Sequence, residues 1–384
     1  MRERMVISGE QVLWPDGTLA GGWVAVEGDR ITQVGRDAPL YPADRHTPFL
    51  APGFVDMHCH GGGGHTFATT DPDEVRAAAA THHAAGTTTV VASLVSADPP
   101  TLLAQVRALA PLVRGTMIAG IHLEGPWLSP LHRGAHRLED LRNPDPAEID
   151  ALLEAGAGTI CMVTLAPELP GGMEAVRRFV AAGVVVAVGH TDADADQLRE
   201  AVDAGATVVT HLFNAMRPLH HRDPGPVVAA LADPRLAVEL IVDGVHVHPD
   251  VVELTVRSTL SRVVLVSDAM AGAAAADGRY RLGPMDVEVV DGVARTLDNG
   301  SIAGSTLTLD RAVRTSVAAG VARCAALLSA TWGPARTLGL DAGQLAPGHR
   351  ADLVGLDRDL DVRLVLRHGE LLRDDVADGP AQDD

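Results

Sequence analysis

The sequence predicts an α/β protein: a (β/α)8 TIM-type barrel with a small β-sandwich domain built from both chain termini. Three observations lead to this fold. In the middle of the chain, eight short apolar runs alternate with alanine-rich, helix-compatible stretches. Both ends of the chain instead carry patterns typical of β-strands. The length of 384 residues and the hydrophobic content of 46% suit one large barrel core with a smaller module.

The predicted domain boundaries follow this change of pattern. Residues 1–51 are expected to form the N-terminal part of the small β domain, with turns such as Pro15-Asp16-Gly17 between the strands. Residues 52–342 form the predicted catalytic barrel. Residues 343–384 return to β-type runs and form the C-terminal part of the small domain. We therefore expect the two ends to share one small sheet beside the barrel.

The barrel elements are predicted from the apolar runs and the stretches between them. The eight strands are expected at Phe54–His58, Thr87–Leu94, Met117–Leu123, Thr159–Leu165, Val184–Val188, Thr207–His211, Leu236–Val242 and Val263–Val266. Helices are expected at Asp73–Ala85, Pro146–Ala155, Met173–Ala182, Asp194–Ala204 and, as one stretch, Leu309–Leu338. His82 and His83 fall inside the first helix and are expected on the surface. The dipeptides Asp291-Gly292 and Asn299-Gly300 predict hairpin turns before the last helical stretch.

Composition excludes several classes of partner. The net charge is −19, from 50 acidic and 31 basic residues, and all the basic residues are arginine. Such an acidic chain argues against binding to nucleic acid or to anionic membranes. The three cysteines make no disulfide framework, and neither a signal peptide nor an apolar run of ~18 residues is visible. A soluble protein in a reducing cytoplasm is the expectation.

Ligand-type residues fall at the ends of the predicted strands. In a (β/α)8 barrel the carboxyl ends of the strands meet at one mouth, where active sites form. His58 and His60 close the first strand, and residues two apart on a strand face the same side. The later strands end at Glu124, His190, His211, His246 and Asp268. Because these side chains gather at one mouth, the sequence predicts a metal site there.

The donor set indicates the kind of metal centre. Six residues supply nitrogen and oxygen donors without thiolate: His58, His60, Glu124, His190, His211 and Asp268. Such donors favour Zn²⁺ first, with Fe, Mn, Co and Cd as alternatives. Since six donors exceed the needs of one catalytic zinc, two divalent metals per subunit are predicted, with Glu124 bridging. The chain has no lysine, so a carboxylated lysine cannot bridge them; a single-metal site with half the donors idle is the alternative.

Two further residues and one loop have expected roles. Asp268 is the best candidate for the general acid and base, since a carboxylate beside activated water can accept its proton; the alternative is a pure ligand. Cys59 points away from its histidine neighbours on the strand and is expected to pack rather than ligate. The loop Arg217–Arg222 is basic in an acidic protein, which favours an anionic substrate, unless its arginines pair with acids such as Asp223.

Several motifs together resemble one family nearly end to end. The motifs are Pro52-Gly-Phe-Val-Asp-Met-His-Cys-His-Gly, His122-Leu-Glu-Gly-Pro-Trp-Leu, Gly189-His-Thr, Thr210-His-Leu-Phe-Asn-Ala-Met, Asp243-Gly-Val-His and Leu265-Val-Ser-Asp-Ala. On these residues the chain resembles the N-acetylglucosamine-6-phosphate deacetylases of the amidohydrolase superfamily. The resemblance implies metal-dependent hydrolysis of the N-acetyl amide, which releases acetate and an amino-sugar phosphate. Because His58 and His60 are present, the chain is similar to the two-metal branch of that family.

The resemblance also implies roles for individual residues. Glu124, His190 and His211 would be the common metal ligands, with Asp268 as the proton donor and acceptor and His246 polarising the acetyl carbonyl. The residues implied to contact the substrate are Ala135, His136, Asn214, Ala215, Arg222, His246, Ile302, Ala303 and Gly304. A homodimer is implied, in which Arg222 reaches the phosphate in the neighbouring subunit's site. His248 departs from the acidic residue that relatives carry there.

Three alternatives stay open at this point. The first is a deacetylase for another amino-sugar phosphate, such as N-acetylgalactosamine 6-phosphate. The second is an enzyme like adenosine deaminase, which expects a glutamate partnered with a histidine after the fifth strand; Gly189-His190-Thr191 has none. The third is a non-catalytic sensor of sugar phosphates, against which the complete set of acid, base and ligand positions argues.

Overall fold

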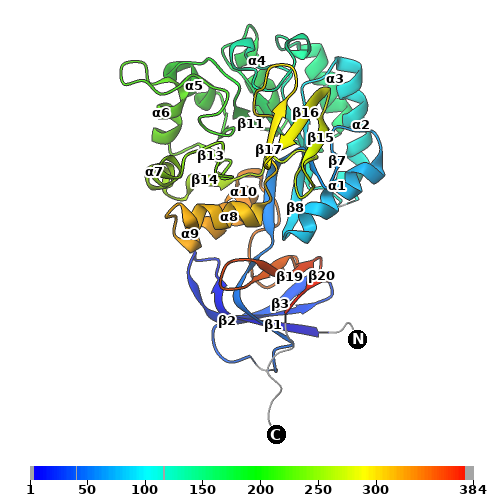
Figure 1. Ribbon diagram of the computed structural model, residues 1–384, viewed down its shortest axis with the longest axis vertical. Coiled ribbons are helices and arrows are strands. Elements are labelled where there is room, and N and C mark those ends of the chain that lie inside the picture. Colours follow the sequence, from blue (N-terminus) through cyan, green and yellow to red (C-terminus); the bar gives the residue numbers. More distant parts are fainter. Residues whose placement is uncertain (1–3, 40, 116, 377–384) are drawn as a thin grey trace.

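A computed structural model describes residues 4–39, 41–115 and 117–376, in which a barrel stands on a small sheet (Figure 1). Eight parallel strands form the barrel in the order β14-β13-β12-β11-β10-β9-β8-β5. Their bounds are β5 (Phe54–Cys59), β8 (Thr87–Val95), β9 (Gly120–Glu124), β10 (Ile160–Leu165), β11 (Val185–Val188), β12 (Val208–Val209), β13 (Ala237–Leu240) and β14 (Val263–Leu265). The predicted (β/α)8 barrel is confirmed, and each strand overlaps its predicted run.

The barrel closes next to the predicted metal ligands. The main-chain N–H of Asp268 donates to the carbonyl of His58 over 2.8 Å, and that of His60 donates to the carbonyl of Ala269 over 2.7 Å. These bonds join the segment after β14 to β5. Closure of the barrel therefore places Asp268 directly beside the two histidines of the first strand.

Helices cover the outside of the barrel. They are α1 (Pro72–Ala84), α2 (Pro99–Arg114), α3 (Pro146–Gly156), α4 (Gly172–Ala181), α5 (Ala195–Asp203), α6 (Gly225–Ala232), α7 (Pro249–Thr259), α8 (Leu309–Ala318), α9 (Arg323–Ala330) and α10 (Trp332–Leu338), with short 3₁₀ turns η1 (Pro130–His132), η2 (Leu138–Asp140) and η3 (Leu260–Arg262). Aspartates accept a hydrogen bond from the first turn of α1, α2, α3 and α5, which explains where these helices begin. The predicted single stretch Leu309–Leu338 is three helices, interrupted around Gly320 and at Thr331.

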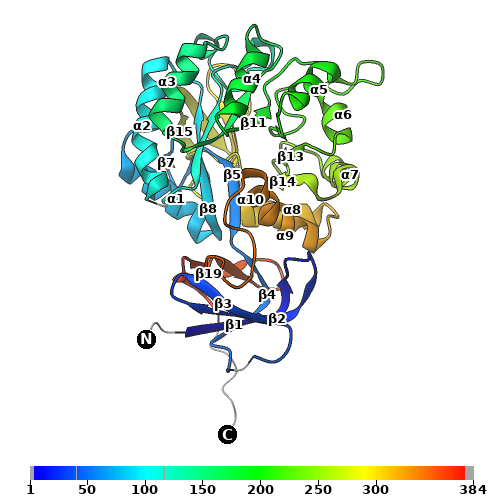
Figure 2. The same ribbon diagram turned by 180° about the vertical axis from the view of Figure 1, so that it is seen from behind.

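Both chain ends meet in one seven-stranded sheet below the barrel (Figure 2). Its order is β20-β19-β18-β4-β1-β2-β3, from β1 (Arg4–Leu13), β2 (Leu19–Glu27), β3 (Arg30–Gly35), β4 (Arg45–Pro52), β18 (Leu353–Leu356), β19 (Val362–Arg367) and β20 (Glu370–Asp374). The sheet folds over a core of its own that draws Ile7 and Val24 from the first segment and Leu353 and Leu364 from the last. The small β-sandwich domain built from both termini is thereby confirmed. The domain boundaries at residues 51/52 and 342/343 stay a prediction.

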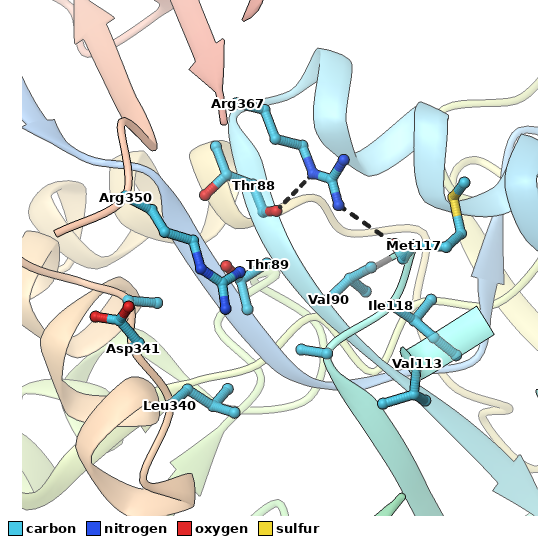
Figure 3. Close-up of a pocket in the computed structure, with 12 residues that line it drawn as sticks. Thr88, Thr89, Val90, Val113, Met117, Ile118, Leu340, Asp341, Arg350 and Arg367 are labelled. Carbon is cyan, nitrogen blue, oxygen red and sulfur yellow. Dashed lines mark hydrogen bonds between the residues drawn. The ribbon is translucent and has the colours of Figure 1, made fainter. Parts of the chain in front are cut away.

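The junction between sheet and barrel contains the pocket of Figure 3, at the amino ends of the barrel strands. Arg367, at the end of β19, donates from Nε to the carbonyl of Thr88 over 3.0 Å and from Nη2 to that of Met117 over 3.5 Å. Arg350 lines the same pocket. Because active sites of this fold lie at the opposite end of the strands, we interpret these contacts as holding the two domains together.

Small strands surround the barrel mouth. They are β6 (Gly61–Gly62), β7 (His65–Thr66), β15 (Gly278–Leu282), β16 (Met285–Val290) and β17 (Val293–Thr296). The predicted turn at Asp291-Gly292 joins β16 and β17, and both of its residues have positive φ, as a tight hairpin requires. A second turn at Asn299-Gly300 pairs Ile302 with Arg295 and thereby returns the chain towards the mouth.

The expected surface position of His82 and His83 is wrong. Both rings are buried, with exposed fractions of 0% and 7%. His82 Nε2 lies 2.8 Å from the carbonyl oxygen of Gly61, and His83 Nδ1 lies 2.8 Å from that of Thr87. The sequence of α1 does not show that the helix face with His82 and His83 packs against Gly61, after β5, and Thr87, at the start of β8.

Candidate metal centre and active site

Glu124 lies at the centre of a cluster of imidazoles. Its Oε1 is 3.1 Å from His190 Nε2, 3.3 Å from His211 Nε2 and 3.4 Å from His58 Nε2. His190 follows β11, His211 follows β12 and His58 lies on β5. They come together because the carboxyl ends of the strands meet at one mouth. The convergence predicted from sequence is thus present in the structure.

The second oxygen of Glu124 faces a different group. Oε2 is 3.2 Å from His60 Nε2 and 3.5 Å from His136 Nε2. Asp268 closes this side, with Oδ1 3.1 Å from His60 Nε2 and 3.5 Å from His58 Nε2. One carboxylate that presents its two oxygens to two sets of donors has the arrangement of a bridging ligand.

The hydrogen bonds of the ring nitrogens test whether these residues fit a metal. Nδ1 of His60 lies 3.2 Å from the Ser93 carbonyl, and Nδ1 of His190 lies 2.9 Å from the His132 carbonyl. A carbonyl oxygen can only accept, so Nδ1 of each of these two rings carries a proton and Nε2 is the atom directed at the cluster. The Nε2 atoms approach one another within 3.1–3.2 Å, from His58 to His60 and from His190 to His211. Imidazole Nε2 atoms that gather around carboxylate oxygens are the donors a divalent cation binds once the rings release their Nε2 protons, so the donor set fits a metal.

The electrostatics of the cluster also favour positive charge. Burial disfavours the imidazolium form, yet hydrogen bonds to Asp268 and Glu124 outweigh it and raise the pKa of His60 to about 9. The pKa of His58 is likewise raised well above its ordinary value, against its burial, mainly by Glu124 and Asp268. Burial would raise the pKa of Glu124, but the surrounding imidazoles hold it well below its ordinary value. For His190 burial dominates and lowers the pKa to about 4. The cluster therefore attracts cations through its two carboxylates.

Several of these residues have strained backbones. His190, His211 and Asp268 have φ of +47°, +26° and +47°, a region that costs a side chain-bearing residue about 1–2 kcal/mol. Each follows a barrel strand at the point where the chain turns into the mouth. Strain that recurs at the ligand positions is typical of a functional site, because it aims the side chains into a common space.

A pocket opens over the cluster and contains most of the predicted substrate residues. Its lining includes His60, Glu124, His190, His211 and Asp268, together with Ala135, His136, Asn214, Ala215, His246, Ile302 and Gly304. Ala303 does not line it, because its side chain packs into the apolar cluster of Met270 and Leu282. Gly304 has a φ of +59°, and a Cβ there would lie 2.8 Å from the carbonyl oxygen of Asp268, so the chain can pass close to Asp268 only with glycine.

The structure gives two residues roles that were not predicted from the sequence: Asp243 orients His246, and His136 is a potential further metal donor. Asp243 Oδ2 lies 2.7 Å from His246 Nδ1, which orients the ring and leaves Nε2 available to the pocket. Burial opposes ionisation of Asp243, but the hydrogen bond from His246 keeps its pKa below the ordinary value. His136, predicted only as a substrate contact, also lies close enough to Glu124 and His190 to form a third donor group. The spacing Asp243 to His246 was a visible signal for the first of these.

The two arginines of the basic loop after β12 differ in their contacts with carboxylates. Arg217 contacts Asp192 over 3.0 Å and Asp223 over 3.6 Å, so the alternative that its charge is neutralised locally holds for this residue. Arg222 is exposed and contacts His221; within the described part of the chain it has no carboxylate partner. It does not line the pocket of its own chain. His248 is exposed near Asp250 and lies outside the donor cluster.

Cys59 lies behind the cluster, as predicted, and is packed rather than exposed. Its Sγ is 3.2 Å from His82 Nε2, and burial raises the pKa of this thiol well above its ordinary value. Together with Asp56 these side chains form a further buried group of potential donors. Because His82 Nε2 already donates to the Gly61 carbonyl, hydrogen bonds account for the contacts of its ring in this group.

Comparisons with known proteins agree with this geometry. The model of the amidohydrolase family matches residues 49–372. An N-acetyl-D-glucosamine-6-phosphate deacetylase of Mycobacterium smegmatis, solved with one aspartate replaced by alanine and in complex with N-acetyl-D-glucosamine-6-phosphate, is 50% identical with a TM-score of 0.94, covering 97% of this chain and 100% of that one. N-acetylgalactosamine-6-phosphate deacetylase of Escherichia coli O157:H7 is 38% identical over 87% of this chain and 90% of its own length. N-acetylglucosamine-6-phosphate deacetylase of Vibrio furnissii is 36% identical over 90% and 86%. In the described part of the chain, no helix has the length and apolar character needed to cross a bilayer.

Proposed function

The chain belongs to the amidohydrolase family, and on that premise we propose that it hydrolyses the N-acetyl amide of N-acetylglucosamine 6-phosphate to glucosamine 6-phosphate and acetate. The observation that carries this proposal is the convergence of Glu124, His190, His211 and Asp268 beneath an open pocket. The 50% identical Mycobacterium smegmatis relative, which was solved with this sugar phosphate, supports the choice of substrate.

The metal requirement follows from the donor set. We propose two divalent cations per subunit, one held by His58, His60 and Asp268 and one by His190 and His211, with Glu124 between them. Zinc is the first candidate, because nitrogen and carboxylate donors without thiolate suit it. When bound, such cations supply Lewis-acid chemistry, which lowers the pKa of water towards ~7 and polarises an acyl oxygen.

The chain's own residues carry the proton transfers. Asp268 Oδ1 faces the cluster, where it can accept a proton from the attacking water and return it to the departing amine nitrogen. Burial opposes ionisation of Asp268, yet His58 and His60 keep its pKa below the ordinary value, so it enters the reaction as a base. His246 donates from Nδ1 to Asp243, which stabilises the imidazolium form; in that form Nε2–H would donate a hydrogen bond to the acetyl oxygen as negative charge develops.

Acetate release from three sugars tests the substrate. We expect turnover with N-acetylglucosamine 6-phosphate, a lower kcat/KM with N-acetylgalactosamine 6-phosphate, and a large loss with unphosphorylated N-acetylglucosamine. Acetate is measured by a coupled assay on the same enzyme preparation. Absence of acetate from every phosphorylated sugar, in protein that carries its metals, would contradict the deacetylase assignment.

The galacto epimer is the second candidate substrate. The 38% identical Escherichia coli O157:H7 relative is a deacetylase for N-acetylgalactosamine 6-phosphate, which is the observation that favours it. The two sugars differ in one hydroxyl configuration, and a site built to hydrogen-bond a hydroxyl discriminates strongly. A higher kcat/KM for the galacto substrate would reassign the substrate and leave the chemistry unchanged.

We further propose a homodimer in which Arg222 binds the substrate phosphate of the neighbouring subunit. Support comes from its position: it is exposed, lies outside its own pocket, and has no carboxylate partner within the described residues. A guanidinium matches phosphate with a bidentate fork.

The reducing cytoplasm is the proposed compartment, since all three cysteines are free thiols.

Replacing Arg222 by alanine is expected to raise KM for the phosphorylated sugar at least ~10-fold, because a charge-assisted contact worth about 1.5–3 kcal/mol is lost. KM for the unphosphorylated sugar should hardly change. Steady-state kinetics on both sugars measures the difference. Arg235→Ala is the matched control, because this exposed arginine pairs with Asp233 and Asp203 instead. Equal effects on the two sugars would count against a phosphate contact.

Mixed dimers test whether the contact crosses subunits. An R222A subunit assembled with a D268N subunit has one site in which the base is intact and Arg222 comes from the partner. Recovery of the low KM in such hybrids supports the contact across the interface. A KM that stays high indicates that Arg222 acts within its own subunit.

A further inference from the structure

A carboxylate lies beneath the donor cluster, inside the barrel. Glu239 is on β13 and its exposed fraction is 0%. Its Oε2 lies 3.1 Å from His58 Nδ1 and accepts the main-chain N–H of His211 over 3.2 Å. Its Oε1 has no partner in the described part of the chain. The carboxylate therefore contacts two of the metal-ligand positions without facing the substrate pocket.

This position is costly for a charged group. The interior of a (β/α)8 barrel is ordinarily filled by branched apolar side chains. Burial of a carboxylate costs several kcal/mol unless a positive partner offsets it. No arginine lies within salt-bridge distance of Glu239 among the residues that the structure describes, and His58 is its ring partner. The negative charge of Glu239 is therefore balanced through His58, by the proton or cation that Nε2 of this ring binds.

His58 differs from the other histidines in this respect. Nδ1 of His60 and of His190 face neutral main-chain carbonyls, at 3.2 and 2.9 Å. Only His58, of the donor rings in the described chain, has a carboxylate at Nδ1. A carboxylate on the far nitrogen fixes the tautomer of a metal-binding imidazole and increases the basicity of its other nitrogen. The effect falls on the half of the centre formed by His58, His60 and Asp268.

We propose that Glu239 is a positioning residue that sets the affinity of the His58–His60 half of the centre for a divalent cation. The inference rests on the proposed two-metal function and adds a residue through which the second metal is retained. Its Oε2 holds the His58 ring with Nε2 aimed at the cluster. The same oxygen accepts the N–H of His211, whose φ of +26° needs support, and so links the two halves of the centre.

Metal titration of Glu239→Gln tests the proposal without substrate. Glutamine keeps the size of the side chain and an acceptor oxygen and removes only the charge. We expect the dissociation constant for Zn²⁺ at one of two positions to rise ~10–100-fold, while the other position is unchanged. Metal-free protein is titrated against a competing zinc chelator, and bound zinc per subunit is counted by mass spectrometry.

The matched control is Asp352→Asn. Asp352 is also a buried carboxylate that accepts a main-chain N–H, from His368 over 2.6 Å, and it lies near the His368 ring, but it belongs to the small β domain. Its zinc affinities should equal those of the unsubstituted protein. Unchanged zinc affinity in E239Q, equal loss at both positions, or the same loss in D352N would each overturn the proposal.

A second measurement applies even where E239Q does not fold. In zinc-loaded unsubstituted protein, the Nδ1 proton of His58 donates to a carboxylate, whereas those of His60 and His190 donate to carbonyls. Charge-assisted bonds are stronger, so in the NMR spectrum the N–H proton assigned to His58 should resonate downfield of those assigned to His60 and His190; the proton of His246, which donates to Asp243, is assigned separately. Absence of such a resonance in protein holding two zinc ions per subunit overturns the proposal. Neither measurement uses a sugar, so a failed deacetylase assignment would not produce the same result.

Discussion

Asp268→Asn is expected to lower kcat for acetate release by roughly 10³–10⁴-fold, because general acid–base catalysis contributes up to that amount and the amide cannot accept a proton. Asparagine keeps the shape and one oxygen of the side chain. Binding of the sugar phosphate, measured by calorimetry, should stay within a few-fold of the unsubstituted enzyme. The effect is thereby separated from a loss of substrate affinity.

Metal content must accompany this measurement, because Asp268 also lies among the metal donors, with Oδ1 3.1 Å from His60 Nε2. The variant is informative when zinc per subunit equals that of the unsubstituted enzyme. D352N serves again as the control for removal of a buried carboxylate. A fully metallated D268N enzyme with near-normal kcat would remove Asp268 from the role of base and leave it as a ligand.

Glu124→Gln is expected to release metal from both halves of the centre and to lower activity more than the ~10–100-fold typical of losing a residue outside the ligand shell. The reason is its central position: Oε1 faces His58, His190 and His211, while Oε2 faces His60. The amide removes the negative charge that offsets two cations. Acetate release and zinc per subunit measure the two effects.

Thermal unfolding with and without zinc gives a readout that does not need substrate. Zinc at 100 times its dissociation constant stabilises the folded chain by about 2.7 kcal/mol per site, so the Tm of the unsubstituted protein should rise on addition of zinc. The Tm of E124Q should not rise when zinc is added. Chelator-treated unsubstituted enzyme, reactivated by zinc, is the control. An E124Q protein that retains two zinc ions and full activity would show that another residue joins the two metals.

Much of the site follows from sequence because the barrel repeats one geometric rule. A ligand-type residue that ends a parallel strand is carried to the common mouth whatever its distance along the chain, as Glu124 and Asp268 illustrate. The pair His58 and His60 follows from the two-residue period of a strand. Three predicted helices begin within one residue of the observed starts of α1, α3 and α5, where an aspartate caps the first turn, whereas α2, α6 and α7 were not predicted.

Sequence alone therefore determined the fold and the mouth at which the predicted donors gather, because these depend on periodicity and strand ends. The tertiary structure decided which groups meet: the two faces of Glu124, the pairing of Arg217 with Asp192, and the burial of His82. Glu239 shows the reason most clearly. It is the single charged residue in an apolar run, and whether its side chain enters the barrel depends on packing between distant strands, which no local pattern encodes.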